Sequence, residues 1–377
     1  MRVTQSPGLP RGFRLSAELA GPIALRPVGI LSGATARAAV AAAEAVPLAG
    51  GPLAFASAEI LLHGADDSLV TAVATLPSIR RWATTEGGTL RRFVERQIER
   101  MTAAREPFAG LELDRPRVVG IVNVTPDSFY DGGAHATVAA AIAHGRALVA
   151  AGADMIDVGG ESSRPGSAAV TEAVELDRVV PVVKALAFDG VPVSVDTRRP
   201  AVMREAAEAG ARAINDVTAL GAPGAIEAVA EAGASVVLMH MQGTPATMQE
   251  APHYDHAPYE VYRFLEARIA ACLAAGIPRA RIAVDPGIGF GKDLDHNLAL
   301  IESFALLHDL GCAVMAGVSR KSFIARIVPG TAAAARLPGT LAATVLAAAQ
   351  GVQLHRVHDA AEARQALAVW EAAARSG

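Results

Sequence analysis

The chain has 377 residues, 51% of them hydrophobic, and its formal net charge is −4 at pH 7. That length suits one large domain plus an accessory piece, and the apolar share allows a core that needs no disulfides. No basic run suggests a nucleic-acid or membrane-surface footprint and no apolar run approaches bilayer length, so we expect neither of these partners.

Residues 1–115 carry no chemical motif and differ in pattern from the rest of the chain. The stretches RPVGILSG (26–33) and SAEILLHG (57–64) accompany helical patterns at 34–46 and 90–104. These patterns predict a small α/β or α+β N-terminal accessory segment of unknown role. With no motif in it, a docking or stabilising role is the favoured interpretation.

The cellular compartment is indicated by two features. The first residues contain prolines and charges but lack the apolar stretch of a signal peptide. The only cysteines, Cys272 and Cys312, lie in a helical and a strand pattern, where they resemble small buried hydrophobic residues more than a disulfide pair. We therefore expect a cytoplasmic, reducing location.

From residue 116 to 377, short apolar runs alternate with Ala-rich helical patterns. Near-continuous apolar strands between helices indicate a parallel sheet that is covered on both faces. Eight such units over roughly 250 residues match an α/β fold of the (β/α)8 TIM-barrel type. A doubly wound open sheet would call for a G-x-G-x-x-G run after the first strand, and none follows. The expected strands are 117–124, 153–160, 191–197, 212–218, 235–241, 281–290, 313–320 and 351–359.

Two of the helices carry readable start or stop signals. Residues 169–187 have Thr171 as the expected N-cap, followed by an apolar face. A helix over 267–278 is expected to stop at Gly276, with Pro278 just beyond.

Polar residues gather at the C-terminal end of almost every expected strand. Active sites of (β/α)8 barrels lie at that end, because the eight loops that follow the strands meet there. We therefore predict one site built from many strands. Its candidates are Asn123, Glu161–Arg164, Asp196, Asn215, Asp216, His240, Gln242, Asp285, Ser319–Ser322, Arg356 and His358.

Asp196, Asn215 and Asp285 are rich in hydrogen-bond acceptors. They suit a neutral heterocycle with several N–H donors, since an unpaired donor in a closed pocket costs about 1–3 kcal/mol. Asp196 and Asp285 have an alternative role, as helix caps. For either residue alone the two interpretations are about equal, and for both together with Asn215 the site is favoured.

Arg164, Lys321, Arg356 and His358 are hydrogen-bond donors that suit an anionic group, and the arginine fork favours phosphate. Asn123 adds a neutral oxygen for Mg²⁺, which takes few protein ligands and completes its shell with phosphate and water. These residue types thus predict an enzyme that binds a ring with several N–H donors beside a phosphorylated or otherwise anionic group.

The remaining histidines favour other roles. His240 is left open between a strand-end and a site residue. His253, His256, His296 and His308 are isolated, and surface or helix-end roles are favoured over metal binding.

With these residues the chain resembles the dihydropteroate synthase family. Its members are folate-pathway transferases that join a pterin to p-aminobenzoate. The motifs occur in order and together are very specific. Two departures are Ser163, where the family usually has Thr, and Tyr130, where a smaller polar residue is common. The matching stretches are NVTPDSF (123–129), GGESSRPG (159–166), SVDT (194–197), IND (214–216), LMHMQG (238–243), DPGIGFGK (285–292), GVSRKSF (317–323) and RVHD (356–359).

The resemblance implies that 6-hydroxymethyl-7,8-dihydropterin pyrophosphate reacts with p-aminobenzoate, giving 7,8-dihydropteroate and pyrophosphate. It implies pyrophosphate departure followed by amine attack, sulfonamide competition for the p-aminobenzoate site, and a homodimer. The residues it assigns are Asp196, Asn215, Asp285 and Lys321 for the pterin; Asn123, Ser163, Arg356 and His358 for the pyrophosphate; Asn123 for Mg²⁺; Phe129, Ser163, Arg164, Pro165 and Ser322 for p-aminobenzoate; and Asp285, Lys321 and Asp196 for catalysis.

Two alternatives remain. A pterin-binding methyltransferase barrel shares the ring-binding logic but holds no pyrophosphate, so SRKS (319–322) and RVHD (356–359) argue against it. A catalytically silent pterin-binding paralogue is disfavoured by the presence of Asn123, Arg356 and His358.

Overall fold

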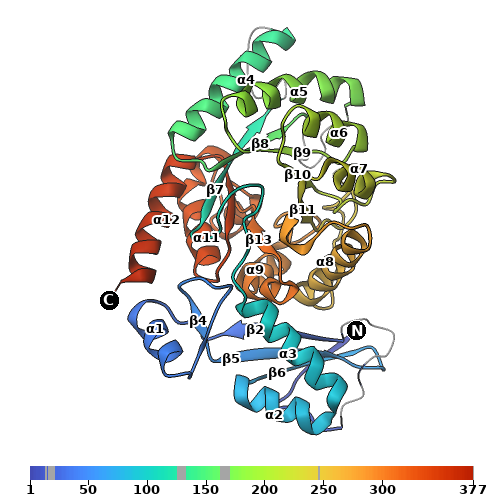
Figure 1. Ribbon diagram of the computed structural model, residues 1–377, viewed down its shortest axis with the longest axis vertical. Coiled ribbons are helices and arrows are strands. Elements are labelled where there is room, and N and C mark those ends of the chain that lie inside the picture. Colours follow the sequence, from blue (N-terminus) through green and yellow to red (C-terminus); the bar gives the residue numbers. More distant parts are fainter. Residues whose placement is uncertain (13–14, 16–21, 125–132, 162–169, 245–246, 377) are drawn as a thin grey trace.

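The computed structural model describes residues 1–12, 15, 22–124, 133–161, 170–244 and 247–376. They form a closed barrel and a smaller α/β unit that precedes it in the chain (Figure 1). The predicted (β/α)8 barrel with an extra N-terminal segment is therefore confirmed.

The barrel consists of eight strands, and each pairs in parallel with its neighbours. The last strand closes on the first, with Val357 opposite Gly120. In chain order the strands are β7 (Arg117–Asn123), β8 (Met155–Gly159), β9 (Val193–Asp196), β10 (Ala213–Asp216), β11 (Ser235–Met239), β12 (Ile282–Asp285), β13 (Ala313–Ala316) and β14 (Leu354–Val357).

All eight expected strands exist, but most are shorter than predicted. The clearest error is the strand expected at 281–290, because β12 ends at Asp285. Pro286 lacks a backbone donor, and Gly287 and Gly289 have φ of +69° and +84°, so the chain leaves the sheet there. The residues beyond Asp285 form a loop at the mouth of the barrel.

The helices lie outside the strands and cover the barrel (Figure 1). Helix α5 begins after Thr171 as predicted, and the Thr171 hydroxyl accepts a hydrogen bond from the Val174 N–H at 3.4 Å. The helix expected over 267–278 is part of a longer one, which starts ten residues earlier, at 257 rather than 267, and stops before Gly276. The helices are α4 (Gly133–Ala150), α5 (Glu172–Phe188), α6 (Pro200–Glu208), α7 (Ala225–Ala232), α8 (Ala257–Ala274), α9 (Leu294–Glu302), α10 (Ser322–Ile327), α11 (Leu337–Ala348) and α12 (Ala360–Arg375), with short 3₁₀ turns η2 (Arg279–Arg281), η3 (Phe304–Leu310) and η4 (Ala333–Ala335).

The N-terminal unit is built on a four-stranded sheet in the order β1–β6–β5–β2, where β1 runs parallel to β6 and the other pairs are antiparallel. Its own apolar core includes Ile23, Ile60 and Trp82. The elements are β1 (Arg2–Gln5), β2 (Ile23–Val28), α1 (Gly33–Ala41), the hairpin β3 (Val46–Pro47) and β4 (Ala54–Phe55), β5 (Ser57–His63), β6 (Ser68–Thr75), α2 (Leu76–Glu86) and α3 (Gly88–Thr102).

This unit packs on the barrel through β2 and α3, which contact η3, and through α1, which contacts α12. The contact centres on the buried carboxylate of Asp309 in η3. Its Oδ2 accepts hydrogen bonds from the Leu25 N–H at 3.3 Å and the Gln97 side-chain amide at 3.1 Å, both in the N-terminal unit. The Tyr262 hydroxyl of α8 donates to the same oxygen at 2.7 Å. One barrel carboxylate therefore ties the two units together.

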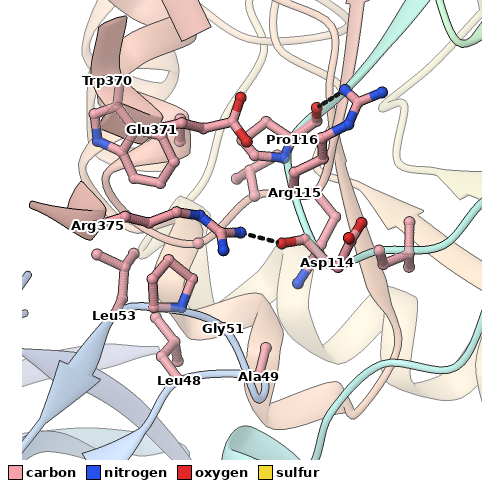
Figure 2. Close-up of a pocket in the computed structure, with 16 residues that line it drawn as sticks. Leu48, Ala49, Gly51, Leu53, Asp114, Arg115, Pro116, Trp370, Glu371 and Arg375 are labelled. Atoms are coloured by element: carbon pink, nitrogen blue, oxygen red, sulfur yellow. Dashed lines mark hydrogen bonds between the residues drawn. The ribbon is translucent and has the colours of Figure 1, made fainter. Parts of the chain in front are cut away.

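A crevice of about 440 Å³ lies between the β3–β4 turn, the linker into β7 and helix α12 (Figure 2). Arg375 crosses it and donates to the Asp114 carbonyl at 2.5 Å. Because Arg115 and Pro116 directly precede β7, the crevice lies at the amino ends of the barrel strands, away from their carboxyl ends. Among the helices that the structure describes, none is both long and apolar enough to span a membrane.

Candidate active site

A pocket of about 320 Å³, partly open to solvent, lies at the carboxyl ends of the barrel strands. Five predicted site residues line it together: Asp196, Asn215, Asp285, Lys321 and Arg356. They come from β9, β10, β12, the loop after β13, and β14, so the barrel closure brings together residues far apart in sequence. Apolar walls are supplied by Val217, Met239, Ile288 and Phe290.

Below the pocket lies a carboxylate that the sequence analysis did not single out, Asp157 on β8, which is 1% exposed. It accepts hydrogen bonds from the Asn215 amide at 3.1 Å and from Arg356 Nε at 2.6 Å. The Ser194 hydroxyl of β9 donates to its other oxygen. A single acid within the otherwise apolar run MIDVG was the signal that could have identified it, since a buried charge needs partners.

Arg356 links two carboxylates, those of Asp157 and Asp196. Besides its bond to Asp157, its Nη2 donates to Asp196 Oδ2 at 2.9 Å. Burial raises the pKa of Asp196, the Arg356 charge opposes that rise, and the Asp157 charge adds to it. The arginine predicted to hold an anion is thus already bonded to two acids, and its Nη1 has no hydrogen-bond partner within the described part of the chain.

Asp285 faces the pocket from the end of β12. Its Oδ1 accepts a hydrogen bond from the Gly287 N–H at 2.7 Å, and a Cβ on Gly317 would lie 3.4 Å from its Oδ2. Burial raises the pKa of Asp285, against the opposing effects of the Gly287 N–H and the Lys321 charge. Helix α9 begins only at Leu294 and is capped by Asp293, so the helix-cap alternative for Asp285 does not hold.

The Lys321 ammonium lies 3.9 Å from the centre of the Phe290 ring, a cation–π arrangement. Gly289 lies against the same side chain, since a Cβ there would be 3.3 Å from Lys321 Cδ. Burial lowers the pKa of Lys321 to about 8; repulsion by Arg356 adds to the shift, while Asp285 and Asp196 oppose it. This lysine therefore changes charge close to neutral pH.

Behind the loop that follows β12 lies a second lysine, Lys292, which is 1% exposed. Its ammonium donates to the Phe290 carbonyl and lies against His240 Nδ1, both at 2.9 Å. Because an ammonium only donates, Nδ1 is the accepting nitrogen and His240 is neutral there. Burial and the Lys292 charge lower the pKa of His240 to about 3, and burial lowers that of Lys292 to about 7. The histidine left open between two roles thus supports the loop that follows β12, through its contact with Lys292.

Other side chains hold the backbone of the same loop. The Gly289 N–H donates to Asn297 Oδ1 at 2.6 Å and the Gly289 carbonyl accepts from Gln249 at 2.8 Å. The Tyr254 hydroxyl donates to the Gly291 carbonyl at 2.9 Å. The loop that carries Phe290 is therefore fixed at several points before any ligand binds.

Three of the described residues that the resemblance assigns to the site do not line the pocket. Asn123 is the last residue of β7, and its Oδ1 lies 3.5 Å from where a Cβ on Gly159 would be, with Asp196 Oδ2 at 3.9 Å from that point. His358 follows β14 and pairs through Nδ1 with the Ser319 hydroxyl at 3.1 Å. Ser322 is the first residue of α10, next to Lys321. Phe129, Ser163, Arg164 and Pro165 lie outside the described residues.

The four isolated histidines occupy varied positions. His256 caps α8 and His296 takes part in the capping box of α9, as the helix-end interpretation expects. His253 is exposed, with 83% of its side chain accessible. His308 lies in the last turn of η3, as the helix-end interpretation expects, but it is fully buried and pairs with the Gln350 carbonyl. No group of three or more His, Cys, Asp or Glu among the described residues could hold a metal.

The barrel has relatives among known proteins. Residues 119–358 match the family model described as pterin binding enzyme. The dihydropteroate synthase of Escherichia coli K12 is 50% identical over 264 residues, which is 70% of this chain and 93% of that protein.

Solved structures agree with the sequence match. A Xanthomonas albilineans dihydropteroate synthase with 4-aminobenzoic acid has a TM-score of 0.66 and 52% identity, covering 70% of this chain and 96% of that one. The same enzyme with 7,8-dihydropteroate gives a TM-score of 0.63 and 49% identity over 70% and 95% of the two chains. A Yersinia pestis dihydropteroate synthase in a sulfonamide drug complex has a TM-score of 0.66 and 48% identity over 70% and 95%.

Proposed function

This chain belongs to the dihydropteroate synthase family of pterin-binding enzymes, and on that premise we propose that the pocket at its barrel mouth carries out the family's reaction. The enzyme condenses 6-hydroxymethyl-7,8-dihydropterin pyrophosphate with p-aminobenzoate to 7,8-dihydropteroate and pyrophosphate, a transferase step of folate biosynthesis. The observation that carries this assignment is the meeting of Asp196, Asn215, Asp285, Lys321 and Arg356 in one pocket.

The pterin ring lies among the acceptors on the pocket floor. Asp285, Asp196 and Asn215 Oδ1 accept its N–H groups, and the Phe290 and Met239 side chains cover it. The pairing of acceptors with N–H donors is favourable here because Asp285 and Asn215 are buried, and charge-assisted hydrogen bonds to a buried carboxylate are strong.

The leaving group does most of the chemical work, because an aromatic amine is a weak nucleophile. The C–O bond to the pyrophosphate breaks and its electrons stay on the departing phosphate, while positive charge spreads over the ring. Asp285 and Asp196 stabilise that ring charge, and Lys321 and Arg356 stabilise the growing negative charge. The amine nitrogen then bonds the methylene and loses a proton to solvent or to the pyrophosphate.

The diphosphate extends from the ring toward Asn123 and His358 at the ends of β7 and β14, which are neighbouring strands. Asn123 offers a neutral oxygen above Gly159, where the missing side chain leaves room, and this suits a Mg²⁺ ion that takes its remaining ligands from phosphate and water. Bound there, Mg²⁺ supplies charge stabilisation to the leaving phosphate. The Ser319 hydroxyl holds His358 Nδ1, which fixes the orientation of the imidazole.

For p-aminobenzoate and the sulfonamides that compete with it, we place the site beside Lys321. Ser322, at the start of α10, is its described member, and the family resemblance also assigns Phe129, Ser163, Arg164 and Pro165 to p-aminobenzoate. The relatives with bound 4-aminobenzoic acid and with a sulfonamide support this assignment.

A homodimer and a cytoplasmic location complete the proposal. Exposed apolar side chains occur on or directly after the adjoining helices α9, α10 and α11 and suit contact with a second copy: Leu298, Ile327, Val328 and Leu346. The two cysteines are buried and free, as suits a reducing compartment. Sedimentation velocity tests the dimer: Leu346→Glu is expected to shift the protein toward monomer, and an unchanged sedimentation coefficient would place the contact elsewhere.

The decisive experiment incubates the purified full chain with the pterin pyrophosphate, p-aminobenzoate and Mg²⁺ and follows dihydropteroate and released pyrophosphate. Equal amounts of the two products are expected. Release of pyrophosphate without dihydropteroate, or no turnover with a folded protein, would contradict the assignment.

A further inference from the structure

We propose that Asp157 is a positioning residue that fixes the orientation of Asn215 toward the pterin ring and of Arg356 toward the pyrophosphate. The proposal rests on the function assigned to the same pocket. It adds a residue that lies beneath the pocket and influences which ring the pocket binds. Asp157 does not itself line the pocket, so it acts through its two neighbours.

Three donors from three other strands converge on Asp157. They are the Ser194 hydroxyl of β9, the Asn215 amide of β10 at 3.1 Å and Arg356 Nε of β14 at 2.6 Å. Asp157 is only 1% exposed, so bulk solvent has little access to replace these partners. Asp157 thus links β8 with strands on both sides of it in the closed barrel.

The consequence for Asn215 is a fixed amide orientation. A carboxylate only accepts hydrogen bonds, so the NH₂ end of the amide turns toward Asp157 and the carbonyl oxygen is the end left over. That oxygen has no hydrogen-bond partner within the residues that the structure describes, and Asn215 lines the pocket. Without Asp157 the amide is free to turn over and offer donors instead of an acceptor.

The consequence for Arg356 is a fixed guanidinium plane. Nε is held by Asp157 and Nη2 by Asp196, so two carboxylates at different points set the plane. Without Asp157, the hydrogen bond to Asp196 is the only remaining one of the two. The guanidinium of Arg356 is then free to rotate about that bond. The arginine would then be less well placed for the leaving pyrophosphate, and the asparagine less well placed for the ring.

The recognition that follows is specific to a ring edge with N–H donors. A pterin has a 2-amino group and an adjacent N–H, whereas a lumazine carries a carbonyl oxygen in place of the 2-amino group. An acceptor on the ring facing an acceptor on Asn215 is repulsive, and two unpaired acceptors in a closed pocket are costly. Asp157 therefore contributes to selection of pterin over lumazine.

The test is titration calorimetry of the full chain with 6-hydroxymethylpterin and 6-hydroxymethyllumazine. Asp157→Asn is expected to raise the pterin Kd by about 10- to 100-fold and to reduce the pterin-over-lumazine ratio by about tenfold, the size of one lost polar contact. Steady-state kinetics are expected to show a larger rise in KM for the pterin pyrophosphate than for p-aminobenzoate. Asp157→Ser serves as a second variant should Asp157→Asn fail to fold.

A double-mutant cycle shows whether the effect passes through Asn215. In an Asn215→Ala background, Asp157→Asn is expected to lose most of its effect on the ring ratio. The matched control is Asp216→Asn, which removes a buried acid next to Asn215 that pairs with the Thr218 and Leu220 N–H groups and does not line the pocket. It is expected to leave the pterin Kd within about threefold.

Each outcome bears on the proposal. Wild-type protein that binds the pterin, together with an Asp157→Asn variant that binds it equally, overturns the inference alone. Full additivity in the cycle, or an equal loss in Asp216→Asn, assigns Asp157 a general structural role and also overturns it. Wild-type protein that binds neither ring overturns the proposed function as well.

Discussion

At the scale of single residues, the pocket places opposite charges in a poorly hydrated space, and burial weakens the charged form of each. Burial raises the pKa of Asp285 and lowers that of Lys321 to about 8. The two effects bring acid and base closer together in pKa than they are in water, which is typical of groups that act on a substrate near neutral pH.

Lys321 should therefore limit activity at high pH. The charged form is present below about pH 8 and is lost as the pH rises through that value, so kcat/KM for the pterin pyrophosphate is expected to fall above it. Lys321→Arg keeps its charge throughout and should shift the fall to higher pH, even if its maximum rate is lower. A pH–rate profile measures both, and an identical alkaline limb in the two proteins would assign the titration to another group.

Asp285→Asn should separate chemistry from folding. The amide keeps the size of the side chain but removes the charge that stabilises a cationic ring, so kcat/KM is expected to fall by about 10- to 100-fold or more. Because burial already penalises the charged carboxyl, the free energy of unfolding should remain close to that of the wild type. Urea denaturation beside the kinetics checks this. Loss of stability in proportion to activity would point to a structural role.

At the scale of elements, the loop after β12 is the part that positions Phe290 over Lys321. It runs through three glycines with positive φ, Gly287, Gly289 and Gly291, and is held by side chains from several elements. Loops fixed in this way keep a binding group in place without the cost of ordering it when the ligand arrives.

Gly287→Ala is expected to lower the free energy of unfolding by more than the positive φ of this position alone accounts for. A Cβ at this position would overlap the carbonyl oxygen of His240, whereas a Cβ added to Gly276, with φ of +86°, would have nothing within 4 Å. Gly276→Ala should cost about 1 kcal/mol for its left-handed backbone, and Gly287→Ala clearly more, about 2–4 kcal/mol. Urea denaturation of both variants measures the difference, and equal costs would show that the loop yields easily.

The sequence predicted the barrel and much of the pocket because apolar strands and polar strand ends leave a local pattern. Asp196, Asn215 and Asp285 were found this way. Asp157 was missed because it lies within a strand, and its partners on β10 and β14 are adjacent only once the barrel closes. The hydrogen bonds of Arg356 to two acids could not be predicted either, because its charge alone assigned it to an anionic group of the ligand. The extra length predicted for β12 came from counting apolar loop residues as strand.

At the scale of the whole molecule, the N-terminal unit and the barrel are joined through a carboxylate that burial holds near its neutral form. Burial raises the pKa of Asp309 to about 7, with the Tyr262 hydroxyl and the Leu25 N–H opposing the shift. Its Oδ1 is buried and has no hydrogen-bond partner among the described residues. The junction is therefore sensitive to pH.

Stability should follow this titration. In the unfolded chain an Asp releases its proton near pH 4, and in the folded protein near pH 7, so the native state loses stability as the pH rises between about 4 and 7. Asp309→Asn stays neutral and should lack that slope, with a difference on the order of 4 kcal/mol across the interval, at about 1.4 kcal/mol per pH unit. Urea denaturation at several pH values gives both slopes. Parallel slopes would mean that Asp309 is not the titrating group.

Strand β1 forms one border of the N-terminal sheet, and all four of its residues, Arg2 to Gln5, are exposed. Unpaired backbone groups along such a border invite strands of other molecules to add on, which is how ordered aggregates grow. Here the border is only four residues long and begins with a charged arginine side chain, and both properties discourage that growth. The protein should accordingly stay dispersed when it is concentrated, even though its sheet has an open side.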